Sequence, residues 1–216
     1  MTIRCGGFGS ELGRSMIEML GVLAIVGVLS VGGISAFQKA MNKHKINQVT
    51  EELSQFINEL LRYSADWRRV YVQKGPADVV LSSEIDFFLP RKWSREGKFV
   101  YDSMGNKIFV RLRSGGTLNG VLDITYVFTA GDDKTKMDLC MTYYERLKVY
   151  ADSIRNISIW RQGSDNSSQF LRVEGNGYCG AGKTCLKDLT LSEMREKCSY
   201  IKGDDVYDNF EIRFSL

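Results

Sequence analysis

Large apolar residues are concentrated near the start of the chain. Residues 19–37 include no charged side chain, and most of them are aliphatic. As a helix, this segment would rise about 28 Å, close to the ~30 Å hydrocarbon core of a bilayer. Secretory signal peptides usually have a shorter apolar core of about 7–15 residues. We therefore predict a retained helix that spans a membrane, with a cleaved signal peptide as the alternative.

The helical pattern continues after this segment, but its apolar positions then fall on one side. They recur at spacings of three and four residues, which is typical of a helix that packs on a domain. Gly75 and Pro76 are expected to end the helix. We predict one continuous helix, with residues 14–38 in the membrane and residues 39–74 packed on the protein's own domain. The packed positions are Ile46, Val49, Leu53, Phe56, Ile57, Leu60, Leu61 and Trp67.

The remainder of the chain, residues 75–216, has the short alternating runs of β-strands. The runs 99–101 and 108–112 flank a turn-forming segment at residues 102–106, which predicts a hairpin. One long helix followed by mainly antiparallel strands indicates an α+β fold. Further strands are expected at residues 122–129, 154–160, 170–173 and 210–214, and helices at about residues 135–150 and 192–198.

Composition and charge exclude several functions. The chain is 44% hydrophobic and 25% charged, as in ordinary folded proteins. Its net charge of +3 is spread along the sequence and forms no basic face, so we predict no nucleic-acid partner. His44 is the only histidine, so hydrolysis of the Ser-His type lacks its base and a histidine-based zinc site lacks its ligands. We predict neither an enzyme nor a cofactor.

The cysteines indicate an oxidising compartment. Cys5 precedes the apolar segment, whereas Cys140, Cys179, Cys185 and Cys198 follow it. Four cysteines allow three connectivities. The short separation of Cys179 and Cys185 favours a local loop, which leaves Cys140 for Cys198. Because disulfides persist outside the cytoplasm, we expect the part after the apolar segment to be exported. The lysines after the segment oppose this orientation, but only by a small excess.

One carboxylate lies at the edge of the apolar segment. Glu18 follows Gly13 by five residues, and Arg14 comes directly after that glycine. An acid at mid-membrane costs about 2.5–3.5 kcal/mol, and somewhat less near the interface, so Glu18 is expected to have a cationic partner. The pattern of glycine, four residues, glutamate and an apolar run resembles the prepilin signature of type IV pilins and type II secretion pseudopilins.

The resemblance covers about residues 13–45 and assigns roles to three of them. It implies that a prepilin peptidase cuts after Gly13, so that residues 1–13 are a leader and Arg14 becomes the new N-terminus. The peptidase would also methylate the amine of Arg14, where the family usually has Phe, Met or Leu. Glu18 would pair with the N-terminus of a neighbouring subunit during filament assembly. The cut would also remove Cys5 and leave an even number of cysteines.

The resemblance further implies a pilin-like lollipop fold, in which a half-transmembrane helix carries a globular α+β head at residues 75–216. The length and the C-terminal cysteines are most similar to those of larger type IVb pilins. The implied function is a structural subunit of a type IV pilus-like filament. Its partners would be the prepilin peptidase and other pilin subunits. Its location would be the bacterial inner membrane and then a periplasmic or extracellular filament.

Two alternative functions stay open. One is a minor pseudopilin of a type II secretion system, which neither composition nor motif separates from a pilin. Asp102, Gly105 and Asn106 also resemble a pseudopilin Asp-x-x-Gly-Asn turn. The other belongs to a different class, a membrane-anchored periplasmic domain that binds a ligand. The first alternative shares the prepilin signature, whereas the second does not depend on it.

Two weaker motifs lie near the C-terminus. Residues 177–184 fit the phosphate-loop pattern G-x-x-x-x-G-K-[ST], but too few residues follow for a nucleotide-binding sheet. We interpret them as a disulfide-closed glycine loop. Asp204, Asp205 and Asp208 have oxygen ligands at short spacing and are a weak Ca²⁺ candidate. A solvated turn is the preferred interpretation, and no metal site is predicted.

Overall fold

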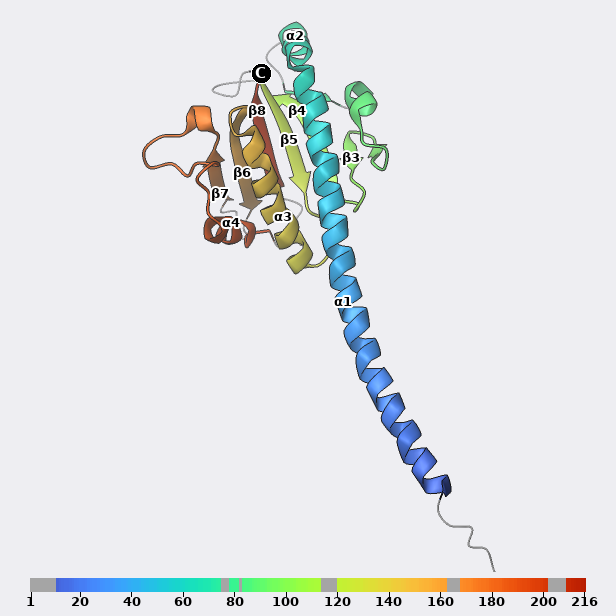
Figure 1. The fold of residues 1–216 in the computed structure, drawn as a ribbon. Coiled ribbons are helices and arrows are strands. Elements are labelled where there is room, and N and C mark those ends of the chain that lie inside the picture. Colours follow the sequence, from blue (N-terminus) through green and yellow to red (C-terminus); the bar gives the residue numbers. More distant parts are fainter. Residues whose placement is uncertain (1–10, 75–77, 82, 114–119, 163–167, 202–208) are drawn as a thin grey trace, which may run out of the picture. The chain divides into compact units, whose positions relative to one another are not determined.

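A computed structural model describes the chain apart from residues 1–10, 75–77, 82, 114–119, 163–167 and 202–208. It divides into two compact units, residues 1–44 and 45–216, which are described separately. Helix α1 (Glu11–Arg62) starts in the first unit and ends in the second (Figure 1). The predicted combination of a long apolar helix with a mainly antiparallel α+β domain is confirmed at this level.

The second unit is built on one antiparallel sheet, with strands in the order β2-β3-β4-β5-β8-β6-β7. Strand β1 also pairs with β4, on the same edge as β3. The final strand, β8, lies in the centre, where Ile212 is opposite Ile124 of β5 and Ile157 of β6. The strands are β1 (Val79–Leu81), β2 (Ser94–Glu96), β3 (Phe99–Tyr101), β4 (Lys107–Arg113), β5 (Val121–Val127), β6 (Ile154–Gln162), β7 (Ser168–Glu174) and β8 (Asn209–Ser215).

The helices of this unit begin with well-formed caps. The Asp132 side chain accepts a hydrogen bond from the backbone N–H of Thr135 at 2.9 Å and starts α3. Thr190 and Glu193 form a reciprocal capping box that starts α4. The further helices are α2 (Ser64–Lys74), α3 (Asp133–Leu147) and α4 (Leu191–Cys198), with 3₁₀ turns η1 (Ser83–Phe88), η3 (Lys148–Tyr150) and η4 (Asn176–Tyr178).

The prediction of one continuous helix through residue 74 is wrong. Helix α1 ends at Arg62, and α2 begins at Ser64. The break is stabilised by Trp67, whose indole N–H donates to the backbone carbonyl of Leu60 at 2.8 Å. In a continuous helix this carbonyl would accept from the N–H of Ser64. The indole replaces that bond and adds to the one that the same carbonyl accepts from the backbone N–H of Tyr63 at 3.3 Å. The chain therefore turns at Tyr63 with the Leu60 carbonyl still paired.

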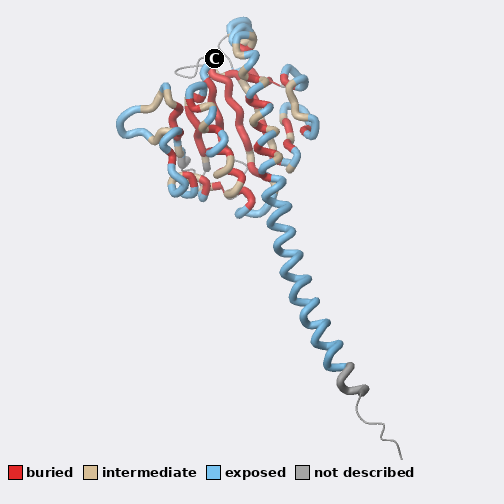
Figure 2. Tube along the Cα trace, viewed as in Figure 1, coloured by how far each residue is buried: buried red, intermediate tan, exposed pale blue. Residues whose placement is uncertain are grey.

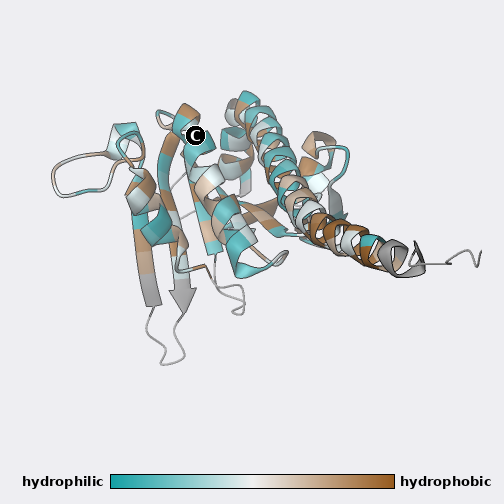
Figure 3. Ribbon diagram, turned by 60° about the horizontal axis from the view of Figure 1, so that its bottom comes forward, coloured by the Kyte–Doolittle hydropathy of each residue, from teal (hydrophilic) through white to brown (hydrophobic). Residues whose placement is uncertain are grey.

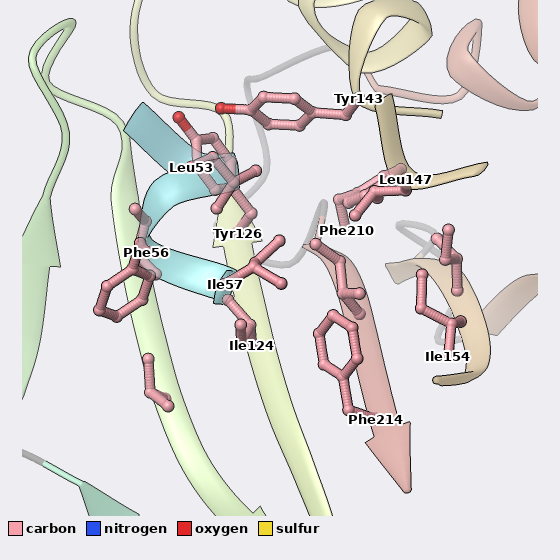
Figure 4. Packing of buried hydrophobic residues seen from close by; sticks show 14 of the residues in the cluster. Leu53, Phe56, Ile57, Ile124, Tyr126, Tyr143, Leu147, Ile154, Phe210 and Phe214 are labelled. Carbon is pink, nitrogen blue, oxygen red and sulfur yellow. The ribbon is translucent and has the colours of Figure 1, made fainter. Parts of the chain in front are cut away.

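The apolar stripe predicted for the second part of α1 is confirmed as part of the core. Leu53, Phe56 and Ile57 point from α1 toward the sheet, where Tyr126 and Phe210 meet them (Figure 4). The strands that carry these residues are buried along most of their length (Figure 2). Burial of each such side chain contributes about 1.5–3 kcal/mol, so this contact holds the end of α1 firmly on the domain.

The predicted hairpin between β3 and β4 is confirmed, and Asp102 and Asn106 of its turn are buried. One oxygen of the Asp102 carboxylate accepts from the backbone N–H groups of Met104 (2.8 Å) and Asn106 (2.9 Å). The other oxygen accepts from the Asn106 amide and the Tyr126 hydroxyl. Burial raises the pKa of the Asp102 carboxyl above its usual range, and the hydrogen bonds from Asn106 and Met104 oppose that shift. Gly105 provides the left-handed conformation of the turn, with φ +93°.

A second carboxylate connects this turn to α1. One oxygen of Glu52 accepts hydrogen bonds from the Trp93 indole at 3.0 Å and from the Ser103 hydroxyl at 2.5 Å. Its other oxygen accepts from Gln48 of the same helix at 2.7 Å. Apolar packing alone would allow α1 to slide along the sheet. The Glu52 contacts fix its position because they join one helical residue to two loops.

Two cysteine pairs are joined in the way that the sequence favours. Cys140 of α3 pairs with Cys198 of α4 across a Cα–Cα distance of 5.8 Å. Cys179 pairs with Cys185 across 5.6 Å. The first pair closes a sequence separation of 58 residues and the second a separation of 6.

We expect Asn106→Ala to lower the free energy of unfolding by about 2–4 kcal/mol. The Asn106 side-chain oxygen accepts from the backbone N–H groups of Thr129 (3.1 Å) and Ala130 (2.9 Å), and alanine leaves both without this acceptor. Denaturant unfolding measures the loss. The matched control is Asn176→Ala, which removes an exposed hydrogen bond to Asp152. Equal losses in the two variants would contradict the role assigned to the buried turn.

We also expect the two disulfides to differ in what they contribute. A longer closed loop restricts the unfolded chain more, so Cys140→Ala/Cys198→Ala should cost about 4 kcal/mol and Cys179→Ala/Cys185→Ala about 2 kcal/mol. The free energies of unfolding of the two double variants provide the comparison. A larger loss of unfolding free energy for the Cys179→Ala/Cys185→Ala variant would show that the entropy of the unfolded chain is not the main contribution of these disulfides.

Candidate functional site

The first part of α1 exposes its side chains in every direction. All side chains described from Met16 to Lys45 are exposed, and burial begins at Ile46 (Figure 2). The large apolar side chains of residues 16–37 are between 50% and 74% exposed. They give α1 a hydrophobic surface over the same stretch (Figure 3). They are Met16, Ile17, Met19, Leu20, Val22, Leu23, Ile25, Val26, Val28, Leu29, Val31, Ile34 and Phe37.

This exposed surface, residues 16–37, is the candidate functional site, which we call the apolar segment. Soluble monomers rarely expose a contiguous apolar patch of this extent, because it is unfavourable in water. Helix α1 is long and apolar enough to cross a membrane by length and composition, with a mean hydropathy of 2.2 in its most apolar window. A membrane or neighbouring helices would remove this apolar surface from water.

The polar groups of the apolar segment differ in how they are satisfied. The Ser30 hydroxyl donates to the backbone carbonyl of Val26 at 2.7 Å, so this side chain is compatible with hydrocarbon. Glu18 is the only charged residue of the segment, and its side chain is exposed. Its carboxylate therefore has the highest cost of transfer into a bilayer and the strongest need for a cation.

The three residues of the prepilin-like motif lie close together at the start of α1. Gly13 and Arg14 are in its first turn, and only their backbone is described. Arg14 and Glu18 are one helical turn apart, so they lie on the same face.

Glycines in the apolar segment have no packing role inside the chain. A Cβ atom added to Gly21, Gly27, Gly32 or Gly33 would meet nothing within 4 Å. Each glycine still destabilises a helix by about 1 kcal/mol relative to alanine. In membranes, small residues allow helices to approach one another closely. These glycines are therefore better suited to contacts with other helices than to the fold of the chain itself.

A second polar site lies on the sheet face that points away from α1 and α3. Side chains alternate along a strand, so the burial of Val110 and Leu112 on the helix side places Arg111 and Arg113 on the other face. The register adds Asp123, Glu211 and Arg213 beside them. We call these five residues, Arg111, Arg113, Asp123, Glu211 and Arg213, the charged cluster.

Arg213 makes the closest ion pairs of the charged cluster. Its Nε lies 3.1 Å from the Asp123 carboxylate, and its Nη2 donates to Glu211. Arg111 is farther away, at 3.5 Å from Asp123 and 3.3 Å from Glu211. Burial raises the pKa of the Glu211 carboxyl, and the nearby Asp123 carboxylate acts in the same direction, whereas the three arginines oppose it.

The sequence analysis missed the charged cluster. Its signal is present as charged residues two positions apart, at 111 and 113 and again at 211 and 213. Such alternation ordinarily indicates a solvated strand face. Only the strand register shows that β4 and β8 both flank β5, so that their arginine side chains cover the carboxylate of Asp123.

The phosphate-loop motif has a different use in the structure. The Lys183 ammonium donates to the backbone carbonyl of Tyr178 at 2.9 Å, so it is turned back onto its own loop. Gly182 adopts a φ of +76°, and the Cys179–Cys185 pair closes the segment. This geometry agrees with the interpretation as a disulfide-closed glycine loop.

The remaining candidates add no metal site to the described part of the chain. His44 is exposed on α1. Asp204, Asp205 and Asp208, the weak Ca²⁺ candidate, lie outside the described residues. Within the described residues, no group of three or more His, Cys, Asp or Glu side chains could hold an ion.

The apolar segment and the charged cluster are the structural evidence for function, because comparisons with known proteins add none. No protein-family model matches the chain, and neither a curated protein nor a solved structure matches it.

Proposed function

We propose that the chain is a structural, non-enzymatic subunit of a type IV pilus-like filament. In this proposal a prepilin peptidase removes residues 1–13 and methylates the amine of Arg14. Before assembly, the subunit is anchored in the bacterial inner membrane with residues 45–216 exported. It then joins other subunits in a periplasmic or extracellular filament through its N-terminal helix.

The observation that carries the proposal is the exposed apolar segment with one acid at its edge. An ordinary membrane anchor needs the apolar length but gains nothing from Glu18, which weakens insertion. In a bundle of helices from several subunits, the same carboxylate can pair with the free amine of a neighbour. Removal of water strengthens such a pair, so Glu18 can align one subunit against the next. The unpartnered glycines of the segment support close helix contacts.

A second candidate within the same class is a minor pseudopilin of a type II secretion system. The turn at residues 102–106 resembles the pseudopilin pattern, and its Asp102 and Asn106 side chains are buried. The protein would then cap or prime a short filament. Its abundance in sheared surface filaments distinguishes the two, since a pilus subunit is a main component there and a minor pseudopilin is not.

Glu18→Ala should abolish assembly while leaving the protein folded and in the membrane. Loss of the ion pair with the neighbouring amine should lower incorporation into sheared filaments by roughly tenfold or more, since about 1.4 kcal/mol corresponds to a factor of ten. Immunoblots of the sheared and membrane fractions measure both quantities.

The matched control is Glu51→Ala, which removes an exposed acid from the same helix outside the apolar segment. It should assemble normally. Normal incorporation of Glu18→Ala would rule out the assembly role. It would favour the membrane-anchored binding domain, which needs neither Gly13 nor Glu18.

Gly13→Ala should block removal of the leader. The expected product retains residues 1–13, whereas the wild-type protein starts at Arg14, and intact-mass spectrometry separates the two. Gly21→Ala is a suitable control because a Cβ atom there meets nothing within 4 Å, so its processing should be unchanged. A Gly13→Ala protein that still begins at Arg14 would show that the cleavage site is assigned wrongly.

A further inference from the structure

A pocket of about 360 Å³ opens over the charged cluster, on the sheet face that points away from α1. Its volume is in the range of small-molecule sites. The described residues on its wall include Arg111, Arg113 and Arg213 on one side and Trp160 and Phe170 on the other. Trp160 of β6 and Phe170 of β7 are directly opposite each other in the register, so they form one apolar wall.

Arg111 and Arg113, at the mouth of the pocket, can still donate hydrogen bonds to a ligand. The side chains of Arg111 and Arg113 are 20% and 23% exposed. Their distances to the Asp123 carboxylate, 3.5 and 3.8 Å, are longer than the 2.7–2.9 Å of a strong charge-assisted hydrogen bond. Arg213 beneath them already binds both buried carboxylates closely. The outer two guanidinium groups are therefore held in place without being saturated.

Unsatisfied donors support the same conclusion. The Nε of Arg111 and the Nδ2 of Asn156 are buried and have no hydrogen-bond partner among the described residues. Asn156 is fully buried and lies opposite Arg213 in the register. Buried donors without an acceptor are rare, because each costs about 1–3 kcal/mol. Both atoms are closed to solvent, so they show incomplete pairing in and beside the charged cluster and are not themselves ligand contacts.

The charges of the wall favour an anion. Three arginines face two buried carboxylates, Asp123 and Glu211. A third carboxylate, Asp78, lies 3.5 Å from Arg113 but is 40% exposed, so water screens it more strongly. The guanidinium of Arg111 stacks over the Phe109 ring at 5.5 Å, which orients its planar fork.

We propose that this pocket binds a small ligand that carries a carboxylate or phosphate group beside a flat apolar part. The anionic group would accept hydrogen bonds from Arg111 and Arg113, and the apolar part would lie against Trp160 and Phe170. This site lies within residues 45–216 and does not depend on filament assembly. It gives the exported unit a recognition role in addition to its structural one.

Isothermal titration of the full chain in detergent micelles tests the proposal, with benzoate, phenyl phosphate and neutral benzyl alcohol as probes. We expect at least one anionic probe to bind, and benzyl alcohol to bind at least about tenfold more weakly. Binding of benzoate alone identifies a carboxylate ligand, and binding of phenyl phosphate alone identifies a phosphate ligand.

Three variants locate the binding site. Arg111→Lys keeps the charge but loses the fork, and should weaken the binding anion by about tenfold. Phe170→Ala removes apolar wall without changing any charge and should weaken it by about threefold, which provides a test even if Arg111→Lys fails to fold. The control is Arg172→Met, since Arg172 is exposed on β7 outside the pocket wall and pairs with Glu174. Absence of binding by both anions, equal binding of benzyl alcohol, or an equal loss in Arg172→Met would overturn the proposal.

Discussion

The packing of α1 on the antiparallel sheet is the contact on which the rest of the structure depends. From Ile46 onward, one side of the helix is buried against β5 and β8, and Glu52 fixes its position through Trp93 and Ser103. Up to Lys45 the same helix is exposed all round. One continuous element therefore combines an apolar segment that needs an environment other than water with a domain that folds around its other end.

Sequence reasoning was most reliable where a pattern is local. The apolar stripe from Ile46 to Trp67 and the hairpin around residues 102–106 follow from periodicity and turn chemistry, and both are present. It failed at Tyr63, because the helix break depends on an indole that bonds a carbonyl seven residues away. It also gave no strands for residues 79–81 and 94–96, which are too short for a period and take their structure from pairing with β4 and β3.

The two candidate sites also differ in whether a local sequence pattern reveals them. The motif of Gly13, Arg14 and Glu18 is contiguous in sequence, so it can be recognised without any structure. The charged cluster draws on β4, β5 and β8, and its central acid, Asp123, is fully buried only because arginines from the flanking strands cover it. Long-range register decides which charges become neighbours, and composition carries no information about that. The buried carboxylates are compatible with the fold because each has a guanidinium partner.

The central place of β8 has a consequence for how the domain of residues 45–216 forms. Asn209–Ser215 follows all other described strands in the chain, yet it lies between β5 and β6. Until it emerges, the meander β1–β5 and the hairpin β6–β7 are two separate sheets, each with an unpaired inner edge open to aggregation. The domain can therefore complete its core only after β8 has been synthesised, and until then both inner edges stay unpaired.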